Sequence, residues 1–437
     1  MKGKLSNKDT LTIGLMLFAL FLGAGNMIFP PALGQAAGEN IWVATLGFLI
    51  TGVGLPLLGV TAIGLTGGNL NNIASKVHPV FGLIFTAVLY LAIGPFFGIP
   101  RTGTVAFEIG VVPFLDEATN ATGTPLLLYT LVFFGLTFWL SLNPTRLVDR
   151  VGKILTPILI IVLGSLIIGA FINPPGTLTS PSTDYQDGVF FKGFIEGYLT
   201  MDAIAALVFG IVVIKAVNDK GVTDRRTVSA AVLKAGILAA IGLTAIYLSL
   251  AYMGATSLDL VGTANNGGEI LSGVADYLFG SFGTLLLGAA ITFACLTTSV
   301  GLVTACGEYF SQVYPKLSYR TVILIITIFS TFVANLGLTQ LITFTLPVLI
   351  AIYPIAIVLI FLTFVNYISP VHRYVYQGAI LLTICISVPN ALEGADLAVP
   401  GLEFLHNLPL YSEGVGWLVP AVTGGIIGLI IGSLSKK

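Results

Sequence analysis

Charged residues are scarce in this sequence. Asp, Glu, Lys and Arg make up 9% of its 437 residues, whereas an average soluble domain contains about 25%. The length would suit about three soluble domains, but the chain lacks the charged residues that their surfaces would need. The net charge is −1, and there is no basic stripe of the kind that binds nucleic acid. We therefore exclude an assembly of soluble domains and a nucleic-acid-binding protein.

Residues that carry enzyme chemistry are also few. The three cysteines lie in apolar runs, at no disulfide or metal-ligand spacing. The three histidines are far apart in the chain. The sequence has neither the paired histidines of a metalloprotease nor a Gly-x-Ser-x-Gly elbow. We expect that the protein is not an enzyme and that it carries no covalent cofactor.

Apolar residues, by contrast, make up 56% of the chain. A helix needs about 20 of them to cross a bilayer, and about twelve runs are suited to that task. These runs lie near 10–35, 41–66, 78–108, 125–142, 151–173, 190–216, 227–256, 283–312, 319–337, 339–366, 372–391 and 415–434. The sequence therefore predicts an all-α, polytopic membrane protein with about twelve transmembrane helices.

The basic residues support this map. If the N-terminus lies inside and each run crosses once, all of the 19 basic residues except Arg101 and Lys192 fall on the inner side. Positive charge gathers on the cytoplasmic side of membrane proteins, and a wrong number of spans would scramble the alternation. We expect both termini in the cytoplasm.

The first run is interrupted near its middle. Gly23, Gly25 and Asn26 are poor helix formers. Pro30 has no N–H to donate and disfavours a helical conformation at the residue before it. The pattern predicts a transmembrane helix that is broken inside the membrane, which is tolerated only where backbone lines a cavity or packs against protein.

The sixth run is interrupted as well, at Gly197, Thr200 and Asp202. An odd number of spans separates the two breaks, so repeats that start at each run are inverted relative to each other. Breaks at matching places in inverted repeats mark the binding sites of transporters. We predict one transport domain, 1–437, with five-helix repeats at about 10–173 and 190–366 and extra helices at about 372–391 and 415–434.

The ends of half-helices can bind charged solutes. Free N–H groups hold a carboxylate, free carbonyl groups hold a cation or an ammonium, and a zwitterionic amino acid needs both. We assign the N–H groups of Ala24 and Gly25 to a substrate carboxylate. The alternative is a glycine kink that serves packing only, but the second break, in the sixth span, favours the binding site.

The eighth span offers oxygen atoms at helical spacing. Ala294 lies one turn before Thr297 and Thr298, so its carbonyl and the two hydroxyl groups can converge on one point. Hard cations prefer such oxygens. The alternative is that the hydroxyl groups bond back to the preceding turn, as they commonly do in spans.

Charged residues within the spans are costly to bury and are therefore usually functional. For Asp202 three interpretations are open: a helix cap, which we favour, a cation or proton site, or a ligand for the substrate ammonium. We interpret Arg101 and Glu108 as outer-gate or interfacial residues rather than substrate ligands. Four residues can form an apolar wall for a branched side chain, although aromatic residues in spans usually only pack: Phe96, Phe97, Tyr198 and Met201.

Two of these motifs resemble the sodium-coupled leucine-transporter fold. They are Gly23-Ala-Gly-Asn26 with Phe29-Pro30, and Phe293-Ala-Cys-Leu-Thr-Thr-Ser299. The resemblance implies that Asn26 matches a side-chain ligand of one sodium site. It also implies a second sodium site, formed by the carbonyl groups of three residues and the hydroxyl groups of two: Ala19, Leu22, Ala294, Thr297 and Thr298.

Nearly the whole chain is similar to the bacterial branched-chain amino acid:cation symporter family. The similarity is carried by Gly23–Pro31, Gly94–Thr102 and Gly197–Ala203. It implies sodium-driven import of leucine, isoleucine and valine across the cell (inner) membrane. The substrate-binding residues that we predict are Ala24, Gly25, Asn26, Gly197, Tyr198, Thr200 and Phe96.

Two alternatives are kept open. One is a proton-coupled importer of other small neutral amino acids. The other is a nutrient sensor with a transporter-like fold, although such sensors tend to carry long soluble appendages that this sequence lacks. A channel would need a symmetric pore or a filter, and neither is visible. The expected partners are the amino acid, sodium as the coupling ion and the lipid bilayer.

Overall fold

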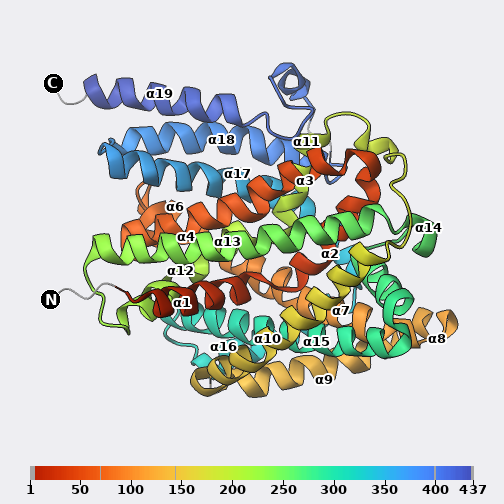
Figure 1. Ribbon diagram of the computed structural model, residues 1–437. Helices are drawn as coiled ribbons and strands as arrows, with labels where there is room; N and C mark the ends of the chain where they lie inside the picture. Colours follow the sequence, from red (N-terminus) through yellow and green to blue (C-terminus); the bar gives the residue numbers. More distant parts are fainter. Residues whose placement is uncertain (1–4, 69, 143, 398–399, 435–437) are drawn as a thin grey trace.

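The computed structural model describes residues 5–68, 70–142, 144–397 and 400–434. Within these ranges the chain is helical, with turns and short loops and no β-strand. The helices form one bundle in which most long axes run in the same direction or its reverse (Figure 1). The first helix begins and the last helix ends on the same side of the bundle (Figure 1), as an even number of crossings requires.

The predicted apolar runs coincide with helices of the structure, several of them in two or three pieces. The helices with their bounds are α1 (Asn7–Phe21), α2 (Ala24–Ala37), α3 (Ile41–Leu49), η2 (Ile50–Gly54), α4 (Leu55–Thr66), α5 (Leu70–Ala74), α6 (Pro79–Leu91), η3 (Ala92–Phe96), α7 (Gly98–Gly110), α8 (Glu117–Ala121), α9 (Thr124–Ser141), α10 (Pro144–Ile172), α11 (Val189–Glu196), η6 (Gly197–Thr200), α12 (Asp202–Asn218), α13 (Arg225–Ala255), α14 (Leu258–Val261), α15 (Gly267–Val313), α16 (Tyr319–Ala334), α17 (Leu338–Ile368), α18 (Arg373–Glu393) and α19 (Leu418–Leu434).

The all-α membrane fold is confirmed. In the described part of the chain, 7 helical stretches are long and apolar enough to cross a membrane, or 8 if the bent pair α11–η6 and α12 is one span. Three shorter apolar helices are Pro157–Ile172, Tyr319–Ala334 and Leu418–Leu434. The total of about twelve spans, and the division into inverted repeats, stay predictions.

The first predicted break lies between α1 and α2. The Gly23 N–H donates to the Phe21 carbonyl at 2.6 Å and to the Asn26 amide oxygen at 3.2 Å. In a continuous helix this N–H would bond to the carbonyl four residues earlier, that of Ala19. The break therefore releases the Ala19 carbonyl at the end of α1 and starts a new helix, with free N–H groups, at Ala24.

The second predicted break lies between α11 and α12. The chain tightens into the 3₁₀ turn η6, passes through Met201 with a left-handed φ of 61°, and restarts as α12 at Asp202. A left-handed backbone is costly for a residue other than glycine. The two half-spans meet at an angle of 40°.

Glycines fix α2 against its neighbours. A Cβ atom on Gly34 would lie 1.9 Å from the carbonyl oxygen of Ala251 in α13, and one on Gly254 would lie 2.0 Å from that of Pro31. Only residues without a side chain allow such a close approach of two backbones. The start of α2, and with it the first break, is therefore held at a set position beside α13.

Candidate functional site

Three buried polar side chains connect the two helix breaks. Asn26 in α2, Asp202 in α12 and Tyr247 in α13 are 2%, 4% and 0% exposed. The Asn26 amide nitrogen donates to the Asp202 carboxylate at 2.5 Å and to the Tyr247 hydroxyl, which in turn donates to the same carboxylate oxygen at 3.0 Å. We call these three residues the carboxylate cluster. It joins residues that lie far apart in the sequence into one hydrogen-bonded network.

The structure contradicts the predicted role of Asp202 as a helix cap. The residue before α12 is Met201, which makes no side-chain cap bond. The Asp202 N–H instead donates to the Thr200 hydroxyl oxygen at 3.3 Å, and this hydroxyl donates to the Gly197 carbonyl at 2.9 Å. Because the Thr200 hydroxyl, and not the Asp202 side chain, accepts from the backbone at the start of α12, the Asp202 carboxylate is free to turn toward Asn26 and Tyr247.

Arg101, for which an outer-gate or interfacial role was predicted, lies inside the bundle. Its side chain belongs to α7 and is 2% exposed. The guanidinium group stacks over the Phe29 ring, with its central carbon 5.1 Å from the ring centre, and donates through Nη1 to the Leu199 carbonyl. Glu108, by contrast, lies near the end of α7, where its carboxylate accepts from Asn266 at 3.0 Å.

The other predicted residues at the breaks are buried too. Ala24 and Gly25 lie in the first turn of α2, and Gly197 and Tyr198 form the start of η6. The Tyr198 ring stacks on Tyr353 of α17 with the ring centres 4.3 Å apart. All of these residues are enclosed within the bundle.

The structure contradicts the placement of Phe96 in the apolar wall. Its side chain is 41% exposed and meets the Phe329 ring of α16 edge-on, with the ring centres 5.1 Å apart. The reason lies two residues earlier, where Gly94 has a non-helical backbone (φ −86°, ψ −120°) within η3. This kink changes the direction in which the Phe96 side chain points. Regular helical spacing along the third span therefore does not predict the position of Phe96.

The predicted oxygen ligands of the eighth span lie next to the first break. A Cβ atom on Gly23 would be 3.7 Å from the Thr298 hydroxyl oxygen. Both hydroxyl groups donate to the Ala294 carbonyl, Thr297 at 2.8 Å and Thr298 at 3.1 Å. They therefore bond back to the preceding turn, which was the alternative to a cation site. Each hydroxyl oxygen keeps lone pairs that can face a cation. Among the residues that the structure describes, no group of three His, Cys, Asp or Glu side chains could hold a metal ion.

Tyr247 and Tyr353 are the two residues at the site that the sequence did not predict. Both are fully buried, with 0% exposure, in spans without an obvious polar face. A tyrosine is common in a membrane span, and its hydroxyl group gives no sign of which helix it will face. The one available signal was that a buried tyrosine hydroxyl usually has a hydrogen-bond partner.

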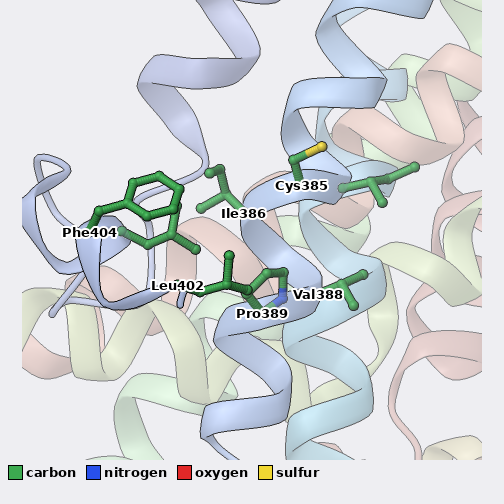
Figure 2. Close-up of a pocket in the computed structure, with 8 residues that line it drawn as sticks. Cys385, Ile386, Val388, Pro389, Leu402 and Phe404 are labelled. Atoms are coloured by element: carbon green, nitrogen blue, oxygen red, sulfur yellow. The ribbon is translucent and has the colours of Figure 1, made fainter. Parts of the chain in front are cut away.

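An apolar pocket lies elsewhere, between α18 and the segment that follows it (Figure 2). Its labelled lining residues are Cys385, Ile386, Val388, Pro389, Leu402 and Phe404 (Figure 2). None of these side chains is charged, so the pocket offers no partner for a carboxylate or an ammonium. It also lies on the predicted extra helices, outside the predicted repeats.

Comparisons with known proteins show the family to which this chain is similar. The family model described as "Branched-chain amino acid transport protein" matches residues 6–435. The chain is 54% identical to branched-chain amino acid permease BraB of Bacillus subtilis over 99% of this chain and 97% of the relative. It is 50% identical to BrnQ of the same species over 100% of both chains. It is 45% identical to the branched-chain amino acid transport system 2 carrier protein of Pseudomonas aeruginosa over 98% of this chain and 97% of the relative.

Two solved structures share the fold at low sequence identity. MhsT in complex with L-phenylalanine matches with a TM-score of 0.58 and 19% identity, over 100% of this chain and 99% of that chain. The inward-facing conformation of Mhp1 matches with a TM-score of 0.60 and 14% identity, over 98% of this chain and 91% of that chain. These similarities confirm the leucine-transporter type of fold that the sequence motifs predicted.

Proposed function

This chain belongs to the branched-chain amino acid transport protein family, and from that premise we propose that it is a secondary active symporter that imports leucine, isoleucine and valine together with sodium. The family consists of transporters and not of enzymes. We further propose the cell membrane as its location, with both termini in the cytoplasm.

The observation that carries the proposal is the meeting of the two helix breaks. Asn26 after the first break bonds to Asp202 after the second at 2.5 Å, so half-helix ends from distant parts of the chain face one place inside the bundle. A half-helix start supports an anion and freed carbonyl groups support a cation. An amino acid zwitterion fits this pair of ends, with its carboxylate at the N–H groups of Ala24 and Gly25.

Sodium coupling is supported by the chemistry of the oxygens beside the first break. The Thr297 and Thr298 hydroxyl groups and the carbonyl of Ala294 are neutral oxygen ligands of the kind that hard cations prefer. The break frees the Ala19 carbonyl, and Leu22 is the last residue before Gly23. Carbonyl groups from α1 and hydroxyl groups from α15 would then share one sodium ion, which couples the ion to the position of α1.

The alternative coupling ion is a proton, and one observation favours it. Asp202 places a buried carboxylate between the two breaks, and intramembrane carboxylates serve as proton relays in transporters. A carboxylate that takes up a proton would have to rearrange its bonds to Asn26 and Tyr247. That rearrangement would act directly on both broken helices.

Uptake of labelled leucine into liposomes tests the function and separates the two ions. The purified protein is reconstituted with sodium or choline outside, each with and without a pH gradient. We expect uptake that needs sodium and is inhibited by valine and isoleucine. Uptake that follows the pH gradient and ignores sodium would support the proton alternative. Absence of uptake under every gradient, by protein that is folded, would overturn the proposed function.

Gly25→Leu tests the location of the substrate. A Cβ atom at this position would lie 3.1 Å from the Phe29 ring and 3.4 Å from Arg101 Nη1, so a leucine side chain would fill the space in front of the α2 amides. We expect uptake to be lost while membrane insertion is kept. The matched control is Gly135→Leu in α9, where a Cβ atom meets nothing within 4 Å. Uptake that survives Gly25→Leu would remove the α2 amides from the site.

A further inference from the structure

Arg101 is a buried cation whose hydrogen bonds are incomplete. Its side chain is 2% exposed, and the atoms Nε and Nη2 have no hydrogen-bond partner among the described residues. In the same part of the chain no carboxylate lies within ion-pair distance of it. A buried charge that is neither paired nor fully bonded is costly. The arrangement therefore calls for an anion that the chain itself does not supply.

The position of the guanidinium group shows where that anion would lie. Nη1 donates to the Leu199 carbonyl in η6, beside the second break. The same atom is 3.4 Å from the place where a Cβ atom of Gly25 would be, in the first turn of α2. Arg101 therefore reaches both breaks from α7, and it lies next to the α2 amides that suit a carboxylate.

The opposite charge lies close by but is already bonded. Asp202 lies three residues after Leu199, to whose carbonyl Arg101 donates. Its carboxylate, however, accepts from both Asn26 and Tyr247. The positive group thus has free donors, while the negative group is the centre of a bonded cluster. A zwitterion between them would place its carboxylate toward Arg101 and its ammonium toward Asp202.

We propose that Arg101 binds the α-carboxylate of the amino acid substrate, together with the first amides of α2. Arginine presents a planar fork of N–H groups that matches both oxygens of a carboxylate, and Nε with Nη2 forms such a fork. The Phe29 ring contacts the group at its central carbon, and neither nitrogen of the fork has a hydrogen-bond partner among the described residues. This inference rests on the proposed function, because it assumes an amino acid at the breaks.

Binding measured with and without a carboxylate on the ligand tests the role of Arg101. The purified full-length protein is titrated with labelled leucine, and unlabelled leucine, leucinamide and leucinol compete. We expect the wild type to prefer leucine strongly over leucinamide, which lacks the carboxylate. In Arg101→Gln we expect leucine affinity to fall at least about tenfold and the preference over leucinamide to disappear. Arg320→Gln, an exposed arginine in α16, is the matched control and should bind as the wild type.

Thermal unfolding separates binding from folding. Because Arg101→Gln removes an unpaired buried charge, the empty variant should unfold at or above the wild-type temperature, and only the stabilisation by added leucine should be lost. If Arg101→Gln does not fold, Arg101→Lys decides, since an ammonium keeps the charge but not the fork. Weaker leucine binding by folded Arg101→Lys supports the proposal, and unchanged binding overturns it.

The outcomes for the wild type and the variant are distinguishable. A wild type that binds leucine, with an Arg101→Gln variant that binds it equally well and still rejects leucinamide, overturns the role of Arg101 and leaves the proposed function standing. A folded wild type that binds none of leucine, isoleucine and valine overturns the proposed function and this inference with it.

Discussion

The carboxylate cluster at the helix breaks and the threonine pair of α15 are two regions that could each hold a cation, and they are built differently. Asn26, Asp202 and Tyr247 are buried, carry one acidic group and bond across three helices. Thr297 and Thr298 are half-buried, neutral and bonded only to their own helix, at Ala294. We therefore expect changes in the first region to affect both folding and transport, and changes in the second to affect transport at little cost in stability.

Asp202→Ala should have the largest effect, because it breaks the cluster at its centre. The variant leaves the Tyr247 hydroxyl buried without its acceptor, at a cost of about 1–3 kcal/mol, and removes one of the two acceptors of the Asn26 amide. We expect loss of leucine uptake in liposomes and a lower unfolding temperature in detergent. Asp276→Ala, an exposed aspartate in α15, should change neither. If Asp202→Ala unfolds at the same temperature as the wild type, the cluster does not hold the breaks together.

Asp202→Asn sharpens this result by separating charge from hydrogen bonding. The asparagine keeps the size of the side chain and one acceptor oxygen for its neighbours. We expect it to unfold closer to the wild type than Asp202→Ala does and still to fail in uptake, since an ammonium or cation would lose its charged partner. Retained uptake by Asp202→Asn would limit Asp202 to a structural role.

Thr298→Val tests the other half of the comparison and should have a smaller, more selective effect. Valine keeps the shape of threonine and removes a hydroxyl group that bonds only to Ala294 of the same helix. We expect an unfolding temperature near the wild type and at least a tenfold higher sodium concentration for half-maximal uptake, or about 1.4 kcal/mol of ion binding.

The control for Thr298→Val is Thr423→Val in α19. That exposed threonine makes the same kind of bond, to Val419 of its own helix at 2.9 Å, but lies on a helix far from the breaks. It should leave the sodium dependence unchanged. If Thr298→Val also leaves it unchanged, the threonine pair does not bind the coupling ion, and Asp202 becomes the remaining candidate.

The same comparison shows what could be predicted from the sequence. The two breaks were predictable because Gly23, Asn26 and Gly197 interrupt apolar runs, and local chemistry decides where a helix stops. The residues that bond across the breaks were not predictable, because Tyr247 and Arg101 reach the site only through the rotation and packing of α13 and α7. Helices that are apolar all round carry little information on which face points inward. The charge of Arg101 was visible, but its burial was not.

Phe96→Ala should have the smallest effect, and it tests how the structure corrects the sequence. If the kink at Gly94 turns Phe96 away from the site, the variant loses only the ring contacts with Phe97 and Phe329, each worth about 0.5–1.5 kcal/mol beyond the area that it buries. We then expect wild-type leucine affinity with a slightly lower unfolding temperature. Tyr198→Ala is the contrasting variant, because its ring is fully buried against Tyr353 at the second break, and it should weaken leucine binding. Loss of leucine affinity in Phe96→Ala would mean that the third span turns Phe96 into the site during transport, in a conformation other than the one described above.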